Sequence, residues 1–379
     1  MKSGRRQSRS DTPKHPSGSG GPDAEANQQA VTTESHPHDR DYDQTPLVVA
    51  WESTQACDLA CDHCRASATK RRHSDELSTE EAVELFEDVA SFSPQPMFVV
   101  SGGDPLWRPD LFELLQAAVD IGITPSVTPA TTSRLTEETI QQFADIGVNR
   151  MALSLDGATA ASHDAFRGET GTFQTVIEAA HHAREAGLSI QINTTVTAAT
   201  VGELPAIADL AEELGAQMWE VFFLVPVGRG AQLAQITPER AHQVTEWLYN
   251  RSREASYRII TVEAPFYRRV ARDMASETGD ETPQVGSTGA GNGFVFVSHT
   301  GDVYPSGFMP LRAGNVREAQ LSTIYRDAEC MQRLRNRAGF DGPCGDCPAT
   351  QYCGGSRSRA YAATGNPTGS DPLCPWVDE

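Results

Sequence analysis

The stretch "CDLACDHC", residues 57–64, places three cysteines within eight positions. It directly follows the apolar run "PLVVAWES" (46–53), which has the length and composition of a buried strand. In a parallel sheet with helical crossovers, functional loops lie at the carboxyl ends of the strands. The cysteine loop is therefore expected at the functional edge of such a sheet.

Five further strand-like runs alternate with helical patterns or long connections. They are "MFVVSGG" (97–103), "TPSVTP" (124–129), "RMALSLDG" (150–157), "SIQINTTV" (189–196) and "MWEVFFLVP" (218–226). Ser78 followed by Glu81 predicts a capping box at the start of the first helix. Strands separated by such connections pair in parallel with right-handed crossovers, and their continuous apolar character predicts a sheet covered on both faces. The sequence thus predicts an α/β fold, either a barrel or part of one.

Composition divides the chain into three parts. Residues 1–44 are polar and rich in Ser, Gly and Pro, which predicts a disordered leader. The strand and helix alternation is assigned to residues 45–240, and residues 241–379 form a second region that ends in a cysteine-rich tail. Within that region, "FVFVSHTGDVYPSGF" predicts a hairpin with its turn near Thr300, Gly301 and Asp302.

The 379-residue chain carries a formal net charge of −20 and only three lysines, at positions 2, 14 and 70. An acidic surface repels phosphate backbones and anionic lipid, so we expect no nucleic-acid or membrane partner. Acidic, lysine-poor surfaces are also typical of proteins from salt-loving organisms. No apolar run has the roughly 18 residues of a membrane span, and no export signal is evident, so we expect a cytoplasmic protein. Cysteines in that compartment favour metal ligation over disulfides.

Two cysteine groups are candidates for metal ligation. The first is Cys57, Cys61 and Cys64, whose coordination of zinc would be completed by His63 or His73. A four-iron cluster held by the same three thiolates would instead leave one iron open to a substrate or cofactor. The second group fits a zinc ribbon or a fully ligated iron–sulfur cluster, and consists of Cys344, Cys347, Cys353 and Cys374.

The first loop and the strand ends resemble the radical S-adenosylmethionine (radical SAM) enzymes from about Pro46 to the C-terminus. The matching segments are the cysteine loop, "SGGDP" (101–105), "SLDG" (154–157), "HDAFRG" (163–168), "INTTV" (192–196) and "VPVGRG" (225–230). The resemblance implies a partial (β/α)6 TIM-like barrel and a [4Fe-4S] cluster on the first three cysteines. It also implies that the open iron binds SAM, which is cleaved to a 5′-deoxyadenosyl radical. SAM contacts are implied for Gly102, Gly103, Asp104, Ser154, Arg167 and Asn193, with Asp104 in place of the family's glutamate.

The tail resembles the SPASM extension of radical SAM proteins, which in full form carries two auxiliary clusters. Ser306 and Arg357 stand where two ligands of one auxiliary cluster would fall. The resemblance therefore implies one auxiliary [4Fe-4S] cluster, on the four tail cysteines. Cys330 matches no ligand position and is expected to be a buried thiol.

The first loop and "GPCGDCPATQYCGGSRSRAYAATGNP" (342–367) are similar to the enzymes that trim tetrapyrrole side chains in the alternative haem and haem d1 pathways. That similarity implies oxidative decarboxylation of iron-coproporphyrin propionates to vinyl groups, which we favour, or the preceding removal of acetate groups. The implied partners are a tetrapyrrole and an electron donor. One alternative is a radical SAM maturase of a ribosomal peptide, and another is a zinc-stabilised binding protein without catalysis.

An anionic tetrapyrrole needs cationic partners, and arginine pairs with carboxylates in a bidentate manner. The candidates are Arg229, Arg268, Arg269, Arg357 and Arg359, each of which is alternatively a structural or solvated arginine. His163 and His299 are candidate ligands of a haem iron, or else ordinary hydrogen-bonded histidines. The sequence assigns neither a catalytic residue nor an oligomeric state.

Overall fold

One twisted sheet organises the protein in the computed structural model, which describes residues 40–279 and 288–377. Its strands are β1 (Val48–Glu52), β2 (Met97–Ser101), β3 (Pro125–Val127), β4 (Arg150–Ser154), β5 (Ser189–Val196), β6 (Met218–Phe223), β7 (Arg258–Val262), β8 (Gly289–Ala290), β9 (Gly293–Val297), β10 (Asp302–Tyr304) and β11 (Gly314–Asn315). The strand order is β11-β10-β9-β1-β2-β3-β4-β5-β6-β7, with β8 paired to β9. The path does not return to its start, so the barrel is open.

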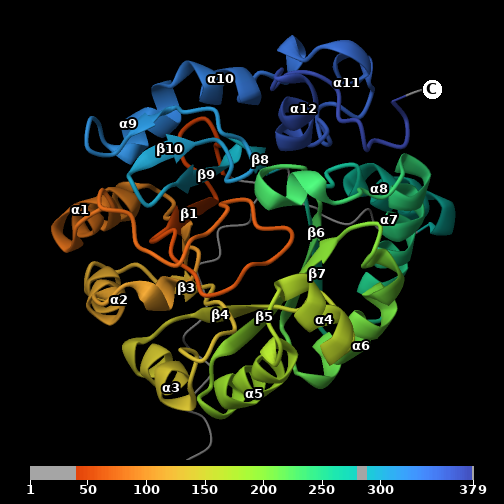
Figure 1. The fold of residues 1–379 in the computed structure, drawn as a ribbon. Coiled ribbons are helices and arrows are strands. Elements are labelled where there is room, and N and C mark those ends of the chain that lie inside the picture. Colours follow the sequence, from red (N-terminus) through yellow and green to blue (C-terminus); the bar gives the residue numbers. More distant parts are fainter. Residues whose placement is uncertain (1–39, 280–287, 378–379) are drawn as a thin grey trace, which may run out of the picture. The chain divides into compact units, whose positions relative to one another are not determined.

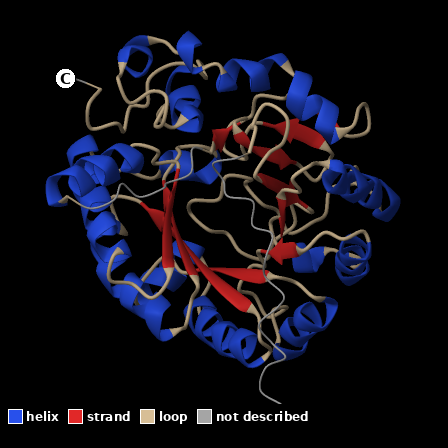
Figure 2. Ribbon diagram, turned by 180° about the vertical axis from the view of Figure 1, so that it is seen from behind, coloured by secondary structure: helices blue, strands red, loops and turns tan. Residues whose placement is uncertain are grey.

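Strands β1 to β7 and β9 run parallel, which brings their carboxyl ends to one edge. Register places Glu52 opposite Ser101 and Ser154 opposite Asn193 at that edge. Figure 2 shows the strands as a curved inner wall with helices around the outside. The sheet and its outer helices confirm the predicted α/β fold with a partial TIM-like barrel.

Most helices cover the outer face of the sheet (Figure 1). The α-helices are α1 (Thr79–Ser91), α2 (Leu111–Asp120), α3 (Glu137–Ile146), α4 (Ala160–Arg167), α5 (Thr172–Glu185), α6 (Leu204–Glu213), α7 (Pro238–Ser252), α8 (Tyr267–Thr278), α9 (Leu321–Asp327), α10 (Glu329–Arg335), α11 (Gly342–Asp346) and α12 (Arg357–Thr364). Short 3₁₀ turns are η2 (Pro105–Trp107), η3 (Val201–Glu203), η4 (Gly228–Gln232) and η5 (Arg337–Gly339).

The helix signals predicted from the sequence have clear local causes. The Ser78 side chain accepts a hydrogen bond from the Glu81 backbone N–H, and the Glu81 side chain bonds the Ser78 backbone in return. This reciprocal pair is the predicted capping box at the start of α1, which satisfies two N–H groups that the helix itself leaves free. The buried side chains of α1 pack on the sheet, where Phe86 contacts the rings of Trp51 and Phe98.

The region after β6 adds further strands to the sheet, beyond the six that the sequence predicted. Strand β7 pairs with β6, and β9 pairs with β1 on the opposite side. The predicted hairpin is confirmed by the antiparallel pair β9 and β10, with Gly301 in the left-handed conformation at φ +83°. In Figure 1, α11 and α12 lie near α7 and α8. The loops beside these helices contact α7 and α8, since Arg268 of α8 donates to the Tyr352 carbonyl and His242 of α7 packs on Trp376.

The predicted leader lies outside the described residues except for its last five, 40–44. There Arg40 donates hydrogen bonds to the carbonyls of Pro94 and Gln95. None of the helices in the described ranges is long and apolar enough to cross a membrane.

Candidate functional site

The first three cysteines lie in the loop after β1, at the carboxyl edge of the sheet. Cys57 and Cys61 are buried and Cys64 is partly buried, and the three pack with Leu59 and Ala130. Backbone N–H groups point at two of the sulfurs: Leu59 N lies 3.4 Å from Cys57 Sγ, and Ala68 N lies 3.5 Å from Cys64 Sγ. These donors suit thiolate sulfurs that are bonded to iron, because N–H···S bonds stabilise their negative charge.

Burial disfavours the charged form of these thiols. It raises the pKa of Cys57 to about 12 and also raises the pKa of Cys61. A thiolate in this position therefore needs a positive charge beside it, which cluster iron would provide. Within the described ranges, no three His, Cys, Asp or Glu side chains are placed to hold a single metal ion. The thiols instead surround a cavity, and the donor set fits a cluster with three protein ligands.

That cavity has a volume of about 210 Å³ and lies at the carboxyl ends of β1 to β6. Besides the three cysteines, it is lined by five of the residues predicted to contact SAM, namely Gly102, Gly103, Ser154, Arg167 and Asn193. The fold thus brings together residues from four separate strand ends and α4.

The two glycines after β2 allow the backbone to pass close to the cysteine loop. A Cβ atom on Gly103 would lie 2.6 Å from the Gln55 carbonyl oxygen and closer still to that of Ala56. The Gly103 N–H donates to the Thr54 carbonyl at 2.7 Å, and the Asp104 N–H donates to the Ala56 carbonyl at 2.7 Å. With these N–H groups engaged, the carbonyl oxygens remain as the acceptors of this turn.

Asp104 differs from the other predicted SAM contacts, because its side chain does not line the cavity. Its buried carboxylate accepts hydrogen bonds from Leu106 N at 3.1 Å, Ala130 N at 3.3 Å and Thr132 Oγ1 at 3.1 Å. Burial nevertheless raises its pKa to about 6. The side chain fixes the turn from β2 into η2 and holds the loop after β3 against it.

Three arginines contribute positive charge to the cavity. Arg167 pairs with buried Asp156 at 3.2 Å, and its Nε is a buried atom without a hydrogen-bond partner among the described residues. Arg229 donates from Nε to the Cys61 carbonyl at 2.8 Å, and its Nη2 is similarly buried and unpartnered. Arg65 pairs with Glu52 at 2.9 Å and lies over the ring of Phe296.

Other residues that the sequence suggested lie elsewhere. Arg268 and Arg357 lie beside the tail cysteines, Arg359 is fully buried, and Arg269 lies over the ring of Trp376. Among the five candidate arginines, only Arg229 lines the cavity.

The histidines also separate into distinct environments. His163 is fully buried and accepts a hydrogen bond from Asp156 N, and burial lowers its pKa to about 4. It does not line the cavity. His299 lies outside the cavity lining and bonds Glu52 through Nδ1 at 2.7 Å. His63, considered above only as a zinc ligand, stacks on Phe166 at 4.8 Å between ring centroids and lines the cavity.

Sequence reasoning missed the apolar part of the cavity wall. The missed residues include Thr128, Pro129, Ala130, Phe222, Phe223, Leu224 and Phe308. Most directly follow β3 or end β6, so the rule that places functional loops at strand ends could have identified them. Phe308 lies beyond the hairpin, and no local pattern connects it to the barrel.

The four tail cysteines line one small cavity of about 30 Å³, together with Gly354, Gly355 and Trp376. Burial raises the pKa of Cys353 to about 11 and that of Cys374 to about 12. Ala349 N lies 3.4 Å from Cys347 Sγ, which again places a donor on a sulfur. Four converging thiols with such donors fit a fully ligated cluster. Cys330, on α10, is only partly buried.

Ser306 and Arg357 stand at the two positions where cluster ligands were expected to be missing, and both make polar contacts. Ser306 lies 3.5 Å from Glu263 Oε1, and Glu263 also accepts hydrogen bonds from Ser356 and Ser358. Arg357 is buried and contacts Cys344 Sγ at 3.5 Å. A serine-carboxylate network therefore joins β7 to the tail at this place.

Comparison with known proteins agrees with this geometry. Residues 51–211 match the radical SAM superfamily, and residues 289–348 match the SPASM iron–sulfur cluster-binding domain. The AdoMet-dependent heme synthase of Methanosarcina barkeri is 38% identical over 338 residues, which cover 87% of this chain and 96% of that protein. The Fe-coproporphyrin III synthase of the same organism is 31% identical over 355 residues, or 88% of each chain.

Solved structures show the same fold. The crystal structure of Streptococcus suis SuiB bound to S-adenosylmethionine has a TM-score of 0.70 and 17% identity. The match covers 87% of this chain and 77% of that one. At this identity the likeness concerns the arrangement of barrel and tail, and not the substrate.

Proposed function

Because the chain belongs to the radical SAM superfamily, in the branch that contains the AdoMet-dependent heme synthases, we propose that it converts iron-coproporphyrin III into haem. Similarity to a heme synthase along nearly the full length of both chains carries this proposal. The Fe-coproporphyrin III synthase, whose name gives the substrate proposed here as its product, is less similar to this chain than the heme synthase is. The two cavities lined by cysteines support the proposal, because each is suited to hold one iron–sulfur cluster.

The proposed reaction turns a propionate side chain into a vinyl group. A hydrogen atom leaves the carbon attached to the ring, the carboxylate leaves as carbon dioxide, and one electron is released. Cys57, Cys61 and Cys64 would hold a four-iron cluster, which together with SAM would supply the hydrogen-abstracting radical chemistry. The protein itself holds SAM and the substrate in the right relative position and excludes water.

Residues around the larger cavity are suited to holding SAM. The carbonyl oxygens of the Gly102–Gly103 turn are proposed to accept the ammonium group, since the neighbouring N–H groups are already bonded. Arg167, with its unpartnered Nε, is proposed to pair with the SAM carboxylate. Ser154 and Asn193, which are opposite each other in register, are proposed as further polar contacts.

The substrate has carboxylates that need cationic partners in an acidic protein. Arg229 is proposed to bind the reacting propionate, because its buried Nη2 has no partner among the described residues and it lines the same cavity. Arg229 also bonds the Cys61 carbonyl, so a carboxylate held there would lie next to the cysteine loop. Phe222 and Phe308 offer apolar surface for the macrocycle.

An electron donor for the first cluster is a further proposed partner, and the cytoplasm is the proposed compartment. The eight cysteines are free thiols in the structure, and the cytoplasm is a compartment that keeps thiols reduced.

Anaerobic reconstitution followed by a substrate assay tests the function. We expect about eight irons per chain, the content of two four-iron clusters, and haem formation from iron-coproporphyrin III with SAM and a reductant. A Cys64→Ala variant serves as the control that should form neither deoxyadenosine nor haem. Deoxyadenosine formed only with a peptide, and an unchanged porphyrin mass, would contradict the proposal and favour a peptide maturase.

A further inference from the structure

Arg357 occupies a position where the full SPASM pattern has a cysteine, yet it lies against a ligand of the retained site. We propose that Arg357 is a positioning residue of the tail site, which donates a hydrogen bond to the Cys344 thiolate and raises the reduction potential of the cluster held there. The side chain is 5% exposed, and its Nη2 lies 3.5 Å from Cys344 Sγ. The guanidinium also stacks on Phe340, with its carbon 4.5 Å from the ring centroid.

Three backbone carbonyls fix the orientation of this guanidinium. Nη1 donates to the Gly369 carbonyl at 2.5 Å and to the Pro367 carbonyl at 3.4 Å, and Nε donates to the Gly355 carbonyl at 3.2 Å. Because these acceptors are main-chain atoms of the tail, the Nη2 atom is held facing the sulfur.

The "CGG" turn before Arg357 provides the room for this contact. Gly354 and Gly355 have φ values of +73° and +63°, in the left-handed region that glycine favours. A Cβ on Gly355 would lie 2.6 Å from Arg357 Nη2 and 3.0 Å from Cys344 Sγ. The second glycine is therefore required at the point where the guanidinium meets the sulfur.

The positive charge of Arg357 has no carboxylate within ion-pair distance among the described residues, although Arg359 nearby is paired with Asp371 at 3.0 Å. Arg268 adds to this positive field from α8, where burial lowers its pKa to about 10 and it interacts with Cys353. Arg337 interacts with Cys353 as well. When the tail cysteines hold a cluster, their thiolates would balance the charge of these cations.

A cationic donor on a ligand sulfur stabilises the more negative, reduced cluster more than the oxidised one, and so raises the potential. This role rests on the proposed function. There, a propionate that has lost a hydrogen atom gives a vinyl group, carbon dioxide and one electron, and an oxidised iron–sulfur cluster is the class of acceptor that takes this electron. A higher potential favours that transfer.

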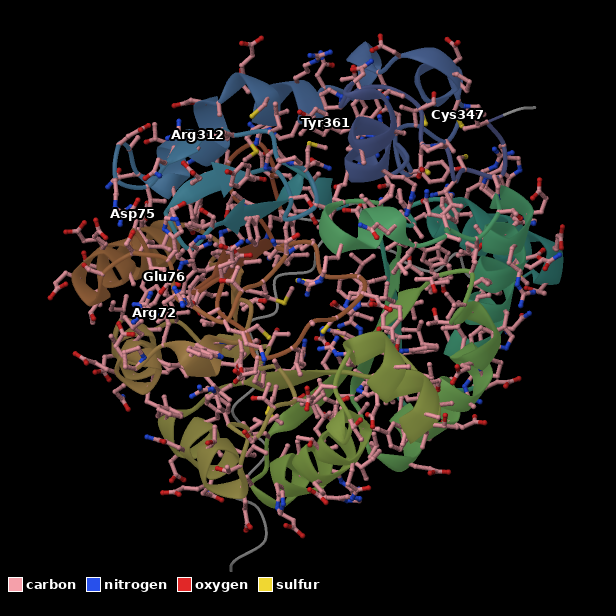
Figure 3. The ribbon with its side chains drawn as sticks, viewed as in Figure 1. Arg72, Asp75, Glu76, Arg312, Cys347 and Tyr361 are labelled. Carbon is pink, nitrogen blue, oxygen red and sulfur yellow. The ribbon has the colours of Figure 1, made fainter. Side chains whose placement is uncertain are left out.

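A redox titration of the holoenzyme, followed by electron paramagnetic resonance, tests the proposal without porphyrin. The tail cluster is identified as the signal that SAM does not change. In Arg357→Gln we expect its reduced-to-oxidised ratio at a fixed potential to fall about tenfold, which is about 59 mV for a one-electron couple. The control is Arg312→Gln, which removes the same charge from an exposed residue that Figure 3 shows well apart from Cys347.

An unchanged midpoint potential in an Arg357→Gln enzyme with full iron content would overturn the proposal. If Arg357→Gln does not take up iron, the reduction potential of Arg357→Lys tests the proposal instead. A lysine keeps the charge but cannot hold the sulfur and the Gly369 carbonyl in one planar fork, so its potential must fall below that of the wild type. Equal potentials in Arg357→Lys and wild type would likewise overturn it. Since no substrate is present, failure here is distinct from failure of haem formation.

Discussion

Arg359 is one of the residues that connect the tail to the barrel. It is fully buried, and its Nη1 pairs with both carboxylate oxygens of Asp371 at 3.0 and 3.1 Å. Its other nitrogens donate to the carbonyls of Phe223, Leu224 and Glu263, at the ends of β6 and β7. Phe223 and Leu224 line the larger cavity, so this side chain connects the wall of one site to the segment that carries the other.

Removing the charge of Asp371 should therefore destabilise the protein strongly. An Asp371→Asn variant leaves the buried guanidinium without its counter-charge, and we expect a loss of about 3–5 kcal/mol. Denaturant unfolding of the holoenzyme measures this loss. Asp209→Asn, which breaks an exposed pair with Arg251, should cost at most about 1 kcal/mol. Equal losses in the two variants would show that the buried pair does not anchor the tail.

Functional residues that follow a regular spacing could be predicted from the sequence. Those that are defined by contacts between distant segments could not. The cysteine spacings grouped the thiols as the fold does, since the cysteines of each predicted group line a single cavity. The contact between Arg357 and Cys344, and the serine contacts of Glu263, depend on packing between segments far apart in sequence. Local patterns carry no information on such contacts.

The turn between β2 and η2 shapes the cavity wall beside the cysteine loop. Gly102 and Gly103 let this turn pass against the backbone of residues 54–56, which leads into the cysteine loop. A side chain at Gly103 would push these two segments apart and so displace the cavity wall that they form.

We therefore expect Gly103→Ala to weaken SAM binding at least tenfold, or about 1.4 kcal/mol. Equilibrium dialysis with the reconstituted enzyme measures this affinity. Gly202→Ala is the matched control, because its Cβ would meet nothing within 4 Å and its φ is not in the left-handed region. Unchanged SAM affinity in Gly103→Ala would show that the turn does not shape the SAM site.

The parallel pairing of β1 to β6 was predicted from the alternation of strands and helices, whereas the outer strands β7 and β9 were not among the predicted barrel strands. Strand β9 pairs with β1, although more than 200 residues separate Val48 from Phe294. Strand β7 carries the β-branched run RIITV but lies at the end of the strand order, where its residues are partly buried or exposed. Sequence periodicity reports local burial, and the pairing of distant strands is decided by tertiary packing.

The whole molecule combines two sites with different degrees of ligation. The barrel site offers three cysteines, and the tail site offers four. This difference suits a site where one iron remains open and a second that only exchanges electrons. The family and the fold were predicted from the sequence because ordered motifs fix them, while the substrate was narrowed only by similarity to proteins of named activity.

Loss of a tail ligand should separate the two sites functionally. In Cys374→Ser we expect the first cluster to remain and to cleave SAM slowly, whereas haem formation falls sharply because the proposed electron acceptor is impaired. Deoxyadenosine and haem are measured in the same reaction by liquid chromatography. Haem formation at the wild-type rate would show that the tail cluster has no part in the reaction.

The most direct test of the proposed function is isotope transfer from substrate to cofactor. Iron-coproporphyrin III with deuterium on the propionate carbons attached to the ring is incubated with the reconstituted enzyme, SAM and reductant. The proposed reaction predicts deuterium in 5′-deoxyadenosine and vinyl groups in the porphyrin product, both detected by mass spectrometry. Deoxyadenosine without deuterium, together with an unaltered porphyrin, would contradict the assignment as a heme synthase.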